Sequence, residues 1–185
     1  MIRPGRKCVP EHPGFELRQV NDRSIVRLRV RPNGADTAGE TLHLPQQPLQ
    51  WRDGDPAACW LGPDQWLLTS DSKTARGMIA DIAQQMPGRL YGATDMSSAF
   101  TCFVFKGPAA RTMLAMGCGI DMDPGEFISG QCVVTNFANL RLLIVAVEDD
   151  RFELYVDRSH ARYLGDWLAH SGEDPMTRDS ELCII

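Results

Sequence analysis

The sequence has no hydrophobic run long enough to cross a membrane as a helix. The longest strongly apolar stretch, LLIVAV at residues 142–147, has the length of a strand. The first fourteen residues, MIRPGRKCVPEHPG, contain basic side chains but no apolar segment behind them, so they do not resemble a secretory signal. We therefore expect a cytoplasmic protein with no membrane partner.

The chain also lacks an excess of basic residues. Its 185 residues include 19 Lys and Arg against 24 Asp and Glu, which gives a formal net charge of -5. Proteins that bind polynucleotides neutralise phosphate groups with lysine and arginine side chains. We therefore expect no nucleic-acid partner.

Motifs for cofactors and metals are missing as well. The six cysteines include no CxxC pair and have no histidine at ligand spacing; they stand at positions 8, 59, 102, 118, 132 and 183. The sequence has no GxGxxG opening a helix and no P-loop, and GCG at 117–119 follows a predicted helix where a phosphate site would precede one. We predict that this chain has no catalytic residue, no metal and no cofactor of its own, and that its strand cysteines are reduced core residues.

A weak internal repeat relates two segments of the chain. DQWLLTSDSKTARGMIADI at 64–82 aligns with DRFELYVDRSHARYLGDWL at 150–168, and each predicts a strand, an aspartate and a helix. Asp71 aligns with Asp157, and we interpret both as helix caps because their oxygens can accept N–H groups of the first turn. Arg76 and Arg162 should take equivalent places on the two helices.

Hairpins precede both repeated helices and complete the predicted organisation. CWLGPDQWLL and LLIVAVEDDRFELYV each contain two strands joined by a short polar turn. The segment 31–58 is rich in Pro, Gly and Asp, and we predict a loop there with at most a short strand near 42–44. The fold class is α+β, with two pseudo-repeated strand-hairpin-helix halves. The predicted divisions are a flexible arm at 1–14, a single domain with halves 15–90 and 91–170, and a tail at 171–185.

The stretch DMSSAFTCFVFKGPAARTML at 95–114 contains a predicted structural joint. It predicts a strand at 100–105, a turn at Gly107 and a helix that begins with Pro108. Ser97 and Ser98 lack the GxSxG context of a nucleophilic serine, so we interpret them as turn residues.

The same stretch, extended to GCGIDM at 117–122, resembles the gamma subunit of heterotetrameric sarcosine oxidase and its aminomethyltransferase-like relatives. LGPDQWLL at 61–68 and RFELYVDRSHARYLGDWL at 151–168 support the resemblance, which covers most of residues 57–170. It implies a fold like the folate-binding domain of glycine-cleavage aminomethyltransferase. It also implies a non-catalytic subunit that supports assembly with alpha, beta and delta partners. Those partners would hold the FAD, FMN, NAD, tetrahydrofolate and zinc.

Two other functions stay open at this point. A stand-alone folate-binding module would need an acidic residue that holds the pteridine, and the candidates are Asp121, Asp123 and Glu126 in IDMDPGEF. A solvated turn is the interpretation we prefer for that loop. An independent hydrolase-like enzyme would need a base beside a nucleophile, and the four histidines lie in no recognisable setting for one.

Two surfaces are candidates for binding partner subunits. In IVRLRV at 25–30, Val26, Leu28 and Val30 share one face of a predicted strand, while Arg27, Arg29 and then Arg31 share the other. The second candidate is the apolar end of the tail, which comprises Leu182, Cys183, Ile184 and Ile185. The amine that such an assembly oxidises does not follow from these residues.

Overall fold

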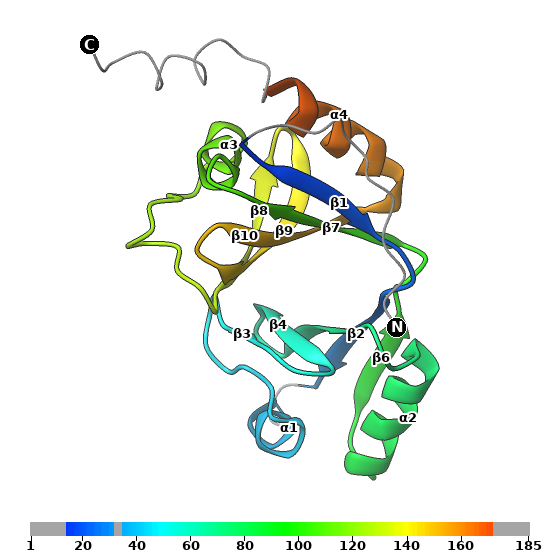
Figure 1. Ribbon diagram of the computed structural model, residues 1–185. Helices are drawn as coiled ribbons and strands as arrows, with labels where there is room; N and C mark the ends of the chain where they lie inside the picture. The colour runs from blue at the N-terminus through cyan, green and yellow to red at the C-terminus, as the bar shows by residue number, and fades with distance from the viewer. Residues whose placement is uncertain (1–13, 32–34, 172–185) are drawn as a thin grey trace, which may run out of the picture.

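Two five-stranded antiparallel sheets face each other, and helices cover the outer face of each (Figure 1). The computed structural model describes residues 14–31 and 35–171. We call the two sheets the N-terminal sheet and the C-terminal sheet, after the half of the sequence that supplies most of their strands.

The N-terminal sheet has the strand order β3-β4-β5-β2-β6. Its strands are β2 (Ser24–Val30), β3 (Trp51–Arg52), β4 (Ala57–Gly62), β5 (Gln65–Ser70) and β6 (Tyr91–Asp95). The helices α1 (Ala35–Leu42) and α2 (Ala75–Gln85) lie on its outer face (Figure 1). Val26, Leu28 and Val30 of β2 pack against this helical layer, as their alternation predicts.

The C-terminal sheet has the strand order β1-β7-β10-β9-β8. Its strands are β1 (Glu16–Val20), β7 (Phe100–Lys106), β8 (Cys132–Phe137), β9 (Leu140–Glu148) and β10 (Arg151–Asp157). Helix α3 (Ala110–Gly117), the short 3-10 helix η1 (Arg158–His160) and α4 (Ala161–Ser171) follow its strands. A third core lies between the two sheets and contains Ile25, Leu67, Val145 and Tyr155.

Two strands are exchanged between the sheets. β1 pairs with β7 at the edge of the C-terminal sheet, although it comes first in the chain. β6 pairs with β2 at the edge of the N-terminal sheet, although it follows residue 90. The predicted division into halves at residue 90 is therefore not a division between the sheets, because each half supplies its first strand to the other half's sheet.

The predicted repeat appears as two copies of a hairpin followed by a helix. β4, β5 and α2 form one copy, and β9, β10 and α4 form the other. Arg76 and Arg162 are each the second residue of their helix, and both are exposed. The fold class predicted from the sequence is thus confirmed.

The prediction that Asp71 and Asp157 cap these helices is wrong. Thr74 caps α2, and its hydroxyl accepts a hydrogen bond of 3.1 Å from the Gly77 N–H. Helix α2 begins at Ala75, so Asp71 lies too far from the free amides of its first turn. Asp157 precedes η1 but makes no cap hydrogen bond with its side chain.

The prediction of a loop with a short strand near 42–44 is also wrong. Residues 35–42 form helix α1, and the short strand β3 lies further along at 51–52. Ala38 is fully buried and Leu44 nearly so, and both pack in the core beneath the N-terminal sheet. This tertiary packing outweighs the weak helix propensity of the segment.

The joint after β7 is structural, as predicted. Gly107 has a φ of +127°, and a Cβ there would lie 2.6 Å from the Gly14 carbonyl oxygen. Only glycine combines that conformation with such a close approach. The prediction that the helix begins with Pro108 is wrong, because Pro108 lies in the turn that follows and α3 begins two residues later at Ala110.

Candidate functional site

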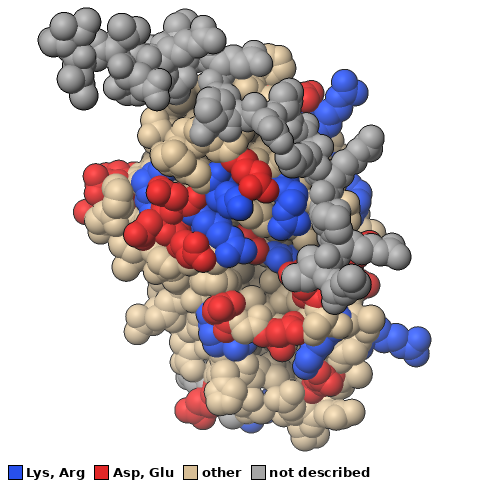
Figure 2. All heavy atoms as spheres, in the orientation of Figure 1, with Lys and Arg blue, Asp and Glu red and all other residues tan. Residues whose placement is uncertain are grey.

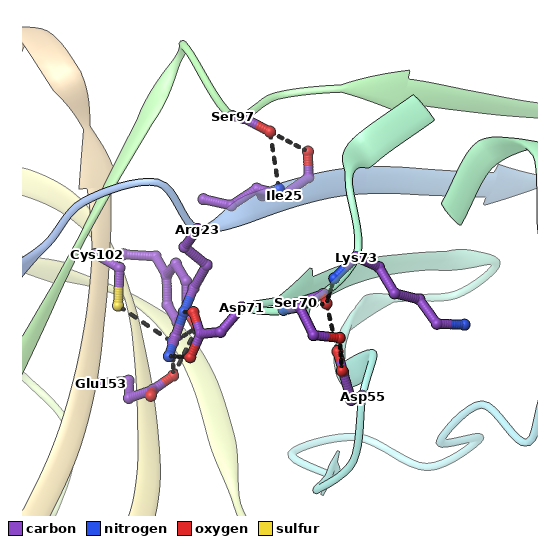
Figure 3. Close-up of polar contacts among 11 residues, drawn as sticks. Arg23, Ile25, Asp55, Ser70, Asp71, Lys73, Ser97, Cys102 and Glu153 are labelled. Atoms are coloured by element: carbon purple, nitrogen blue, oxygen red, sulfur yellow. Dashed lines mark hydrogen bonds and ion pairs between the residues drawn. The ribbon is translucent and has the colours of Figure 1, made fainter. Parts of the chain in front are cut away.

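Arg23 forms a polar cluster between the two sheets. It lies in the crossover from β1 to β2, where the chain passes from one sheet to the other. Its guanidinium donates to both carboxylate oxygens of Asp71, at 2.8 and 2.9 Å. It also contacts Glu153 on β10 at 2.5 Å and the Tyr155 hydroxyl at 2.8 Å (Figure 3). One side chain thus joins the end of β5 in one sheet to β10 in the other.

The electrostatics of this cluster keep Arg23 charged. Burial alone would lower the pKa of Arg23, but the hydrogen bond with Asp71 and the neighbouring acidic groups raise it well above its ordinary value. For Tyr155, in contrast, burial raises the pKa, and its hydroxyl donates a hydrogen bond of 2.6 Å to Glu153. The Tyr155 hydroxyl is therefore neutral at physiological pH, and the cluster is a fixed ion-pair network.

A polar cleft of about 650 Å³ opens beside this cluster. Its lining comprises Arg23, Asp53, Gly54, Asp55, Ala57, Thr69, Ser70, Asp71, Ser72, Arg151 and Glu153. The Ser70 and Ser72 hydroxyls both donate to Asp55, and these hydrogen bonds hold the pKa of that carboxyl below its ordinary value (Figure 3). Figure 2 shows acidic and basic side chains interspersed over this face of the molecule. The lining residues include four carboxylates and two arginines, so the cleft has a mixed charge with an excess of acidic groups.

The serines that line the cleft are held in hydrogen bonds with Asp55. A serine nucleophile needs a neighbouring base such as histidine, and no histidine is among the lining residues. Ser70 accepts hydrogen bonds from the Ser72 and Lys73 amides while it donates to Asp55. These contacts fix the Ser70 hydroxyl within a turn.

Ser97 has a structural role, as the sequence predicts. Its hydroxyl accepts a hydrogen bond of 2.9 Å from the Ile25 N–H (Figure 3). It also donates to Asp95 at 2.6 Å. The two bonds with Ser97 hold the pKa of Asp95 below its ordinary value. Ser97 thus fixes the turn after β6 against the first residues of β2.

The cysteines of the strands are core residues, as predicted. Cys59, Cys102 and Cys132 are each about 1% exposed and lie in the core between the sheets. Burial raises the pKa of Cys102 to about 12, and a hydrogen bond with Cys132 together with burial raises the pKa of Cys59. Over residues 14–31 and 35–171, no group of three or more potential metal-ligating side chains comes together. Within the same residues, no helix is long and apolar enough to span a bilayer.

The folate candidates lie in the loop between α3 and β8. Asp121, Asp123 and Glu126 are all exposed, and none lines the polar cleft. Asp121 accepts a hydrogen bond from the Asp123 N–H, and Asp123 accepts one from the Gly125 N–H. These contacts favour a solvated turn, and folate binding by the three residues stays a prediction.

The arginine row lies on the face of the N-terminal sheet that is turned away from its helices. Arg27, Arg29 and Arg31 are exposed, and Arg27 donates to the Gln65 side chain at 2.7 Å. None of the three forms an ion pair with a carboxylate of the described residues. The other partner-binding candidate, at residues 182–185, lies outside the described part of the chain.

Sequence reasoning missed the Arg23 cluster because its members are far apart in the chain. Arg23 and Glu153 are separated by 130 residues. One indication was available, since Glu153 interrupts the otherwise apolar strand FELYV, and a carboxylate in a buried strand needs a charged or hydrogen-bonding partner. The identity of that partner could not be derived from the pattern.

Comparison with known proteins gives a family and a fold. The family described as "Sarcosine oxidase, gamma subunit family" matches residues 35–174. The gamma subunit of sarcosine oxidase from Corynebacterium sp. (strain U-96) is 28% identical over 116 residues, which cover 60% of this chain and 54% of that protein. The gamma subunit from Arthrobacter sp. is 27% identical over 134 residues, covering 69% and 65% respectively. The chain thus spans between about half and two thirds of the length of these curated relatives.

Two solved structures share the fold. A chain of the heterotetrameric sarcosine oxidase from Corynebacterium sp. U-96 matches with a TM-score of 0.79 and 22% identity, covering 89% of this chain and 87% of that one. The glycine cleavage system aminomethyltransferase T from Bartonella henselae matches with a TM-score of 0.63 and 14% identity, covering 84% and 45%. At these identities the two matches establish the α+β fold with its two antiparallel sheets.

Proposed function

Because the chain belongs to the sarcosine oxidase gamma subunit family, we propose that it is a non-catalytic gamma-type subunit of a heterotetrameric sarcosine oxidase. In this proposal the assembly demethylates sarcosine oxidatively and passes the methyl group to tetrahydrofolate. This chain supports the assembly and stability of the complex. The observation that carries the proposal is the family match over residues 35–174.

The partners in this proposal are alpha, beta and delta subunits in the cytoplasm. FAD, FMN, NAD, tetrahydrofolate and zinc belong to those subunits. The cleft between the sheets supports a structural role for this chain, because Arg23, Asp55, Asp71 and Glu153 are held by hydrogen bonds and ion pairs with other lining residues. Arg23 pairs with two carboxylates, and Asp55 accepts hydrogen bonds from two hydroxyls.

The partner-binding surfaces in this proposal are the arginine row and the end of the tail. Arg27 and Arg29 present positive charge without a carboxylate partner among the described residues, on a chain whose net charge is -5. Such a patch favours an acidic partner surface. The tail candidates at residues 182–185 would contribute apolar area on binding.

Co-expression with the three partner subunits tests the proposal. We expect the chain to co-purify with them and its omission to lower the yield of active complex. We expect the isolated chain to be colourless and to turn over no sarcosine. A flavin absorbance band in the isolated chain, or a full-length chain that never co-purifies with the partners, contradicts the proposal.

The alternative function, a stand-alone folate-binding module, is tested with the same purified chain. A ligand that binds only the folded state raises the melting temperature, and the rise grows with the logarithm of the ligand concentration relative to its Kd. If tetrahydrofolate stabilises the isolated chain and Asp121→Asn removes that effect, the function of a folate-binding module replaces the proposed function of an accessory subunit. We expect no such stabilisation.

A further inference from the structure

β6 forms an edge of the N-terminal sheet, and its outer side pairs with no other strand among residues 14–31 and 35–171. The strand pairs with β2 on one side only, in the register that places Val26 opposite Asp95 and Val30 opposite Tyr91. In an antiparallel pair, residues alternate between those that bond to the neighbouring strand and those whose N–H and C=O groups point away from it. The direction of each β6 backbone group therefore follows from any one hydrogen bond of the ladder.

Two hydrogen bonds fix this alternation. The Met96 N–H donates to the Ile25 carbonyl at 2.8 Å, and the Arg31 N–H donates to the Leu90 carbonyl at 3.1 Å. Residues 90, 92, 94 and 96 consequently bond to β2, while Tyr91, Ala93 and Asp95 point their backbone groups outward. No backbone hydrogen bond satisfies those outward groups within the described part of the chain.

Within the described part of the chain, this edge has no proline, lysine, bulge or covering segment. Natural edge strands are protected by proline, by lysine, by a bulge or by a covering segment. β6 has the sequence YGATD, and its pairing with β2 has no break in register. Leu90, immediately before the strand, is 65% exposed. An open edge with an exposed leucine beside it is suited to β-strand addition.

The side chains on one face of this edge define the chemistry of the added strand. Gly92 and Thr94 lie opposite Arg29 and Arg27 respectively, so these four exposed residues share the face of the sheet that is turned away from its helices. Gly92 has no side chain, and a Cβ there would meet nothing within 4 Å. The small residues of β6 thus leave space between the open edge and the arginines of β2.

We propose that the open edge of β6 pairs with an extended acidic segment of a partner subunit. Strands in a sheet are about 4.8 Å apart, so an added strand would lie about 10 Å from β2. Its acidic side chains at every second position would cross the space over Gly92 and Thr94 and meet Arg29 and Arg27. This inference rests on the proposed function, because it identifies the surface that the accessory subunit uses.

The charges select a partner segment over a second copy of this chain. Two β6 edges paired with each other would bring two arginine rows to the same sheet face, and each row lacks a carboxylate partner among the described residues. Like charges at an interface oppose association. An acidic segment instead supplies the missing carboxylates.

The test uses competition between two gamma chains for the same partners. Wild-type chain and one variant are expressed in equal amounts with tagged alpha, beta and delta subunits, and mass spectrometry measures their ratio in the purified complex. Gly92→Glu supplies an internal carboxylate to the arginines, and Gly92→Gln adds the same bulk without charge. We expect recovery of Gly92→Glu to fall at least about tenfold, which corresponds to about 1.4 kcal/mol, and Gly92→Gln to stay within about twofold of wild type.

A backbone variant and a hydrogen-exchange measurement test the edge itself. Ala93→Pro removes an outward N–H while it leaves the hydrogen bonds to β2 in place, so it should also be recovered at least about tenfold less. In the wild-type complex, the Tyr91 and Ala93 amides should become protected from exchange, whereas they exchange rapidly in the free chain. If Ala93→Pro does not fold, the hydrogen-exchange measurement alone decides whether the β6 edge pairs with a partner strand.

The outcomes separate this inference from the proposed function. If the wild-type chain does not co-purify with the partners, the proposed function fails. If wild type co-purifies but Gly92→Glu is recovered as well as wild type and the Tyr91 and Ala93 amides gain no protection from exchange, the proposal that the β6 edge binds a partner strand is wrong. The proposed function then still stands. If Gly92→Gln is lost as strongly as Gly92→Glu, the acidic character of the partner segment is wrong.

Discussion

Replacing Arg23 by methionine removes the charge that joins the two sheets. Methionine keeps much of the side-chain volume but leaves Glu153 buried without its cation, since the Glu153 side chain is only 11% exposed. Breaking a buried ion pair by removing one partner typically costs about 3–5 kcal/mol. Asp71 is 39% exposed and can be solvated again, so the loss of its pair adds at most about 1 kcal/mol.

We therefore expect Arg23→Met to lower the free energy of unfolding by about 4 kcal/mol. A domain of this size loses about 2–4 °C in melting temperature for each kcal/mol, so the shift should be about 10 °C. Urea unfolding followed by the fluorescence of the four tryptophans measures the change. The matched control is Arg151→Met in the same cleft, whose partner Glu148 is 68% exposed at 3.4 Å, and it should cost less than about 1 kcal/mol.

A double variant tests whether the cost comes from the unpaired carboxylate. Arg23→Met combined with Glu153→Met leaves no buried charge at this position, and it should be less destabilised than the sum of the single variants by about 2 kcal/mol or more. The reasoning is refuted if Arg23→Met costs no more than Arg151→Met. It is also refuted if the two single costs simply add.

Three further changes test separate contacts in the fold. Gly107→Ala should destabilise the protein by more than about 1 kcal/mol in urea unfolding, because the residue has a φ of +127° and the added Cβ would lie 2.6 Å from the Gly14 carbonyl oxygen. The control Gly92→Ala should be nearly neutral. Equal costs for the two variants contradict this reasoning. Thr74→Ala removes the α2 cap and should cost about 1 kcal/mol, and an unchanged urea midpoint would show that the cap is dispensable. Because the pKa of Asp55 is lowered in the folded state, its carboxylate stabilises the fold above about pH 4, and this stabilisation is lost as the pH falls below that value. The stability difference between Asp55→Asn and wild type should therefore shrink on acidification. A difference that does not depend on pH rules this out.

The type of most secondary-structure elements followed from local sequence patterns. Alternating Val26, Leu28 and Val30 predicted β2, and the hairpin-helix pattern predicted both copies of the repeat. Such patterns work because the burial of one face repeats every two residues in a strand and every 3.6 in a helix, which neighbouring residues suffice to show. Where the local pattern was weak, as at α1, the burial of Ala38 and Leu44 decided the structure.

The resemblance that the sequence showed also gave the family, and the match over residues 35–174 confirms it. The roles of individual residues could be predicted less well from the sequence. Asp71 looked like a helix cap because an aspartate followed by a serine is common at helix starts. In the folded chain its carboxylate accepts two hydrogen bonds from Arg23, which is 48 residues away. The side chain therefore has a partner that no local pattern contains.

The sequence by itself determined the hairpin and helix of each repeated unit and the burial of the strand cysteines. Only the tertiary structure decided that β1 and β6 exchange sheets, that Arg23 joins Asp71 to Glu153, and that the outer edge of β6, beside Arg27 and Arg29, pairs with no strand of the described residues. The physical reason is that side-chain periodicity is a local property of the chain. The choice of strand partner and of charge partner depends instead on which distant segments can pack together with least strain and no unpaired charge.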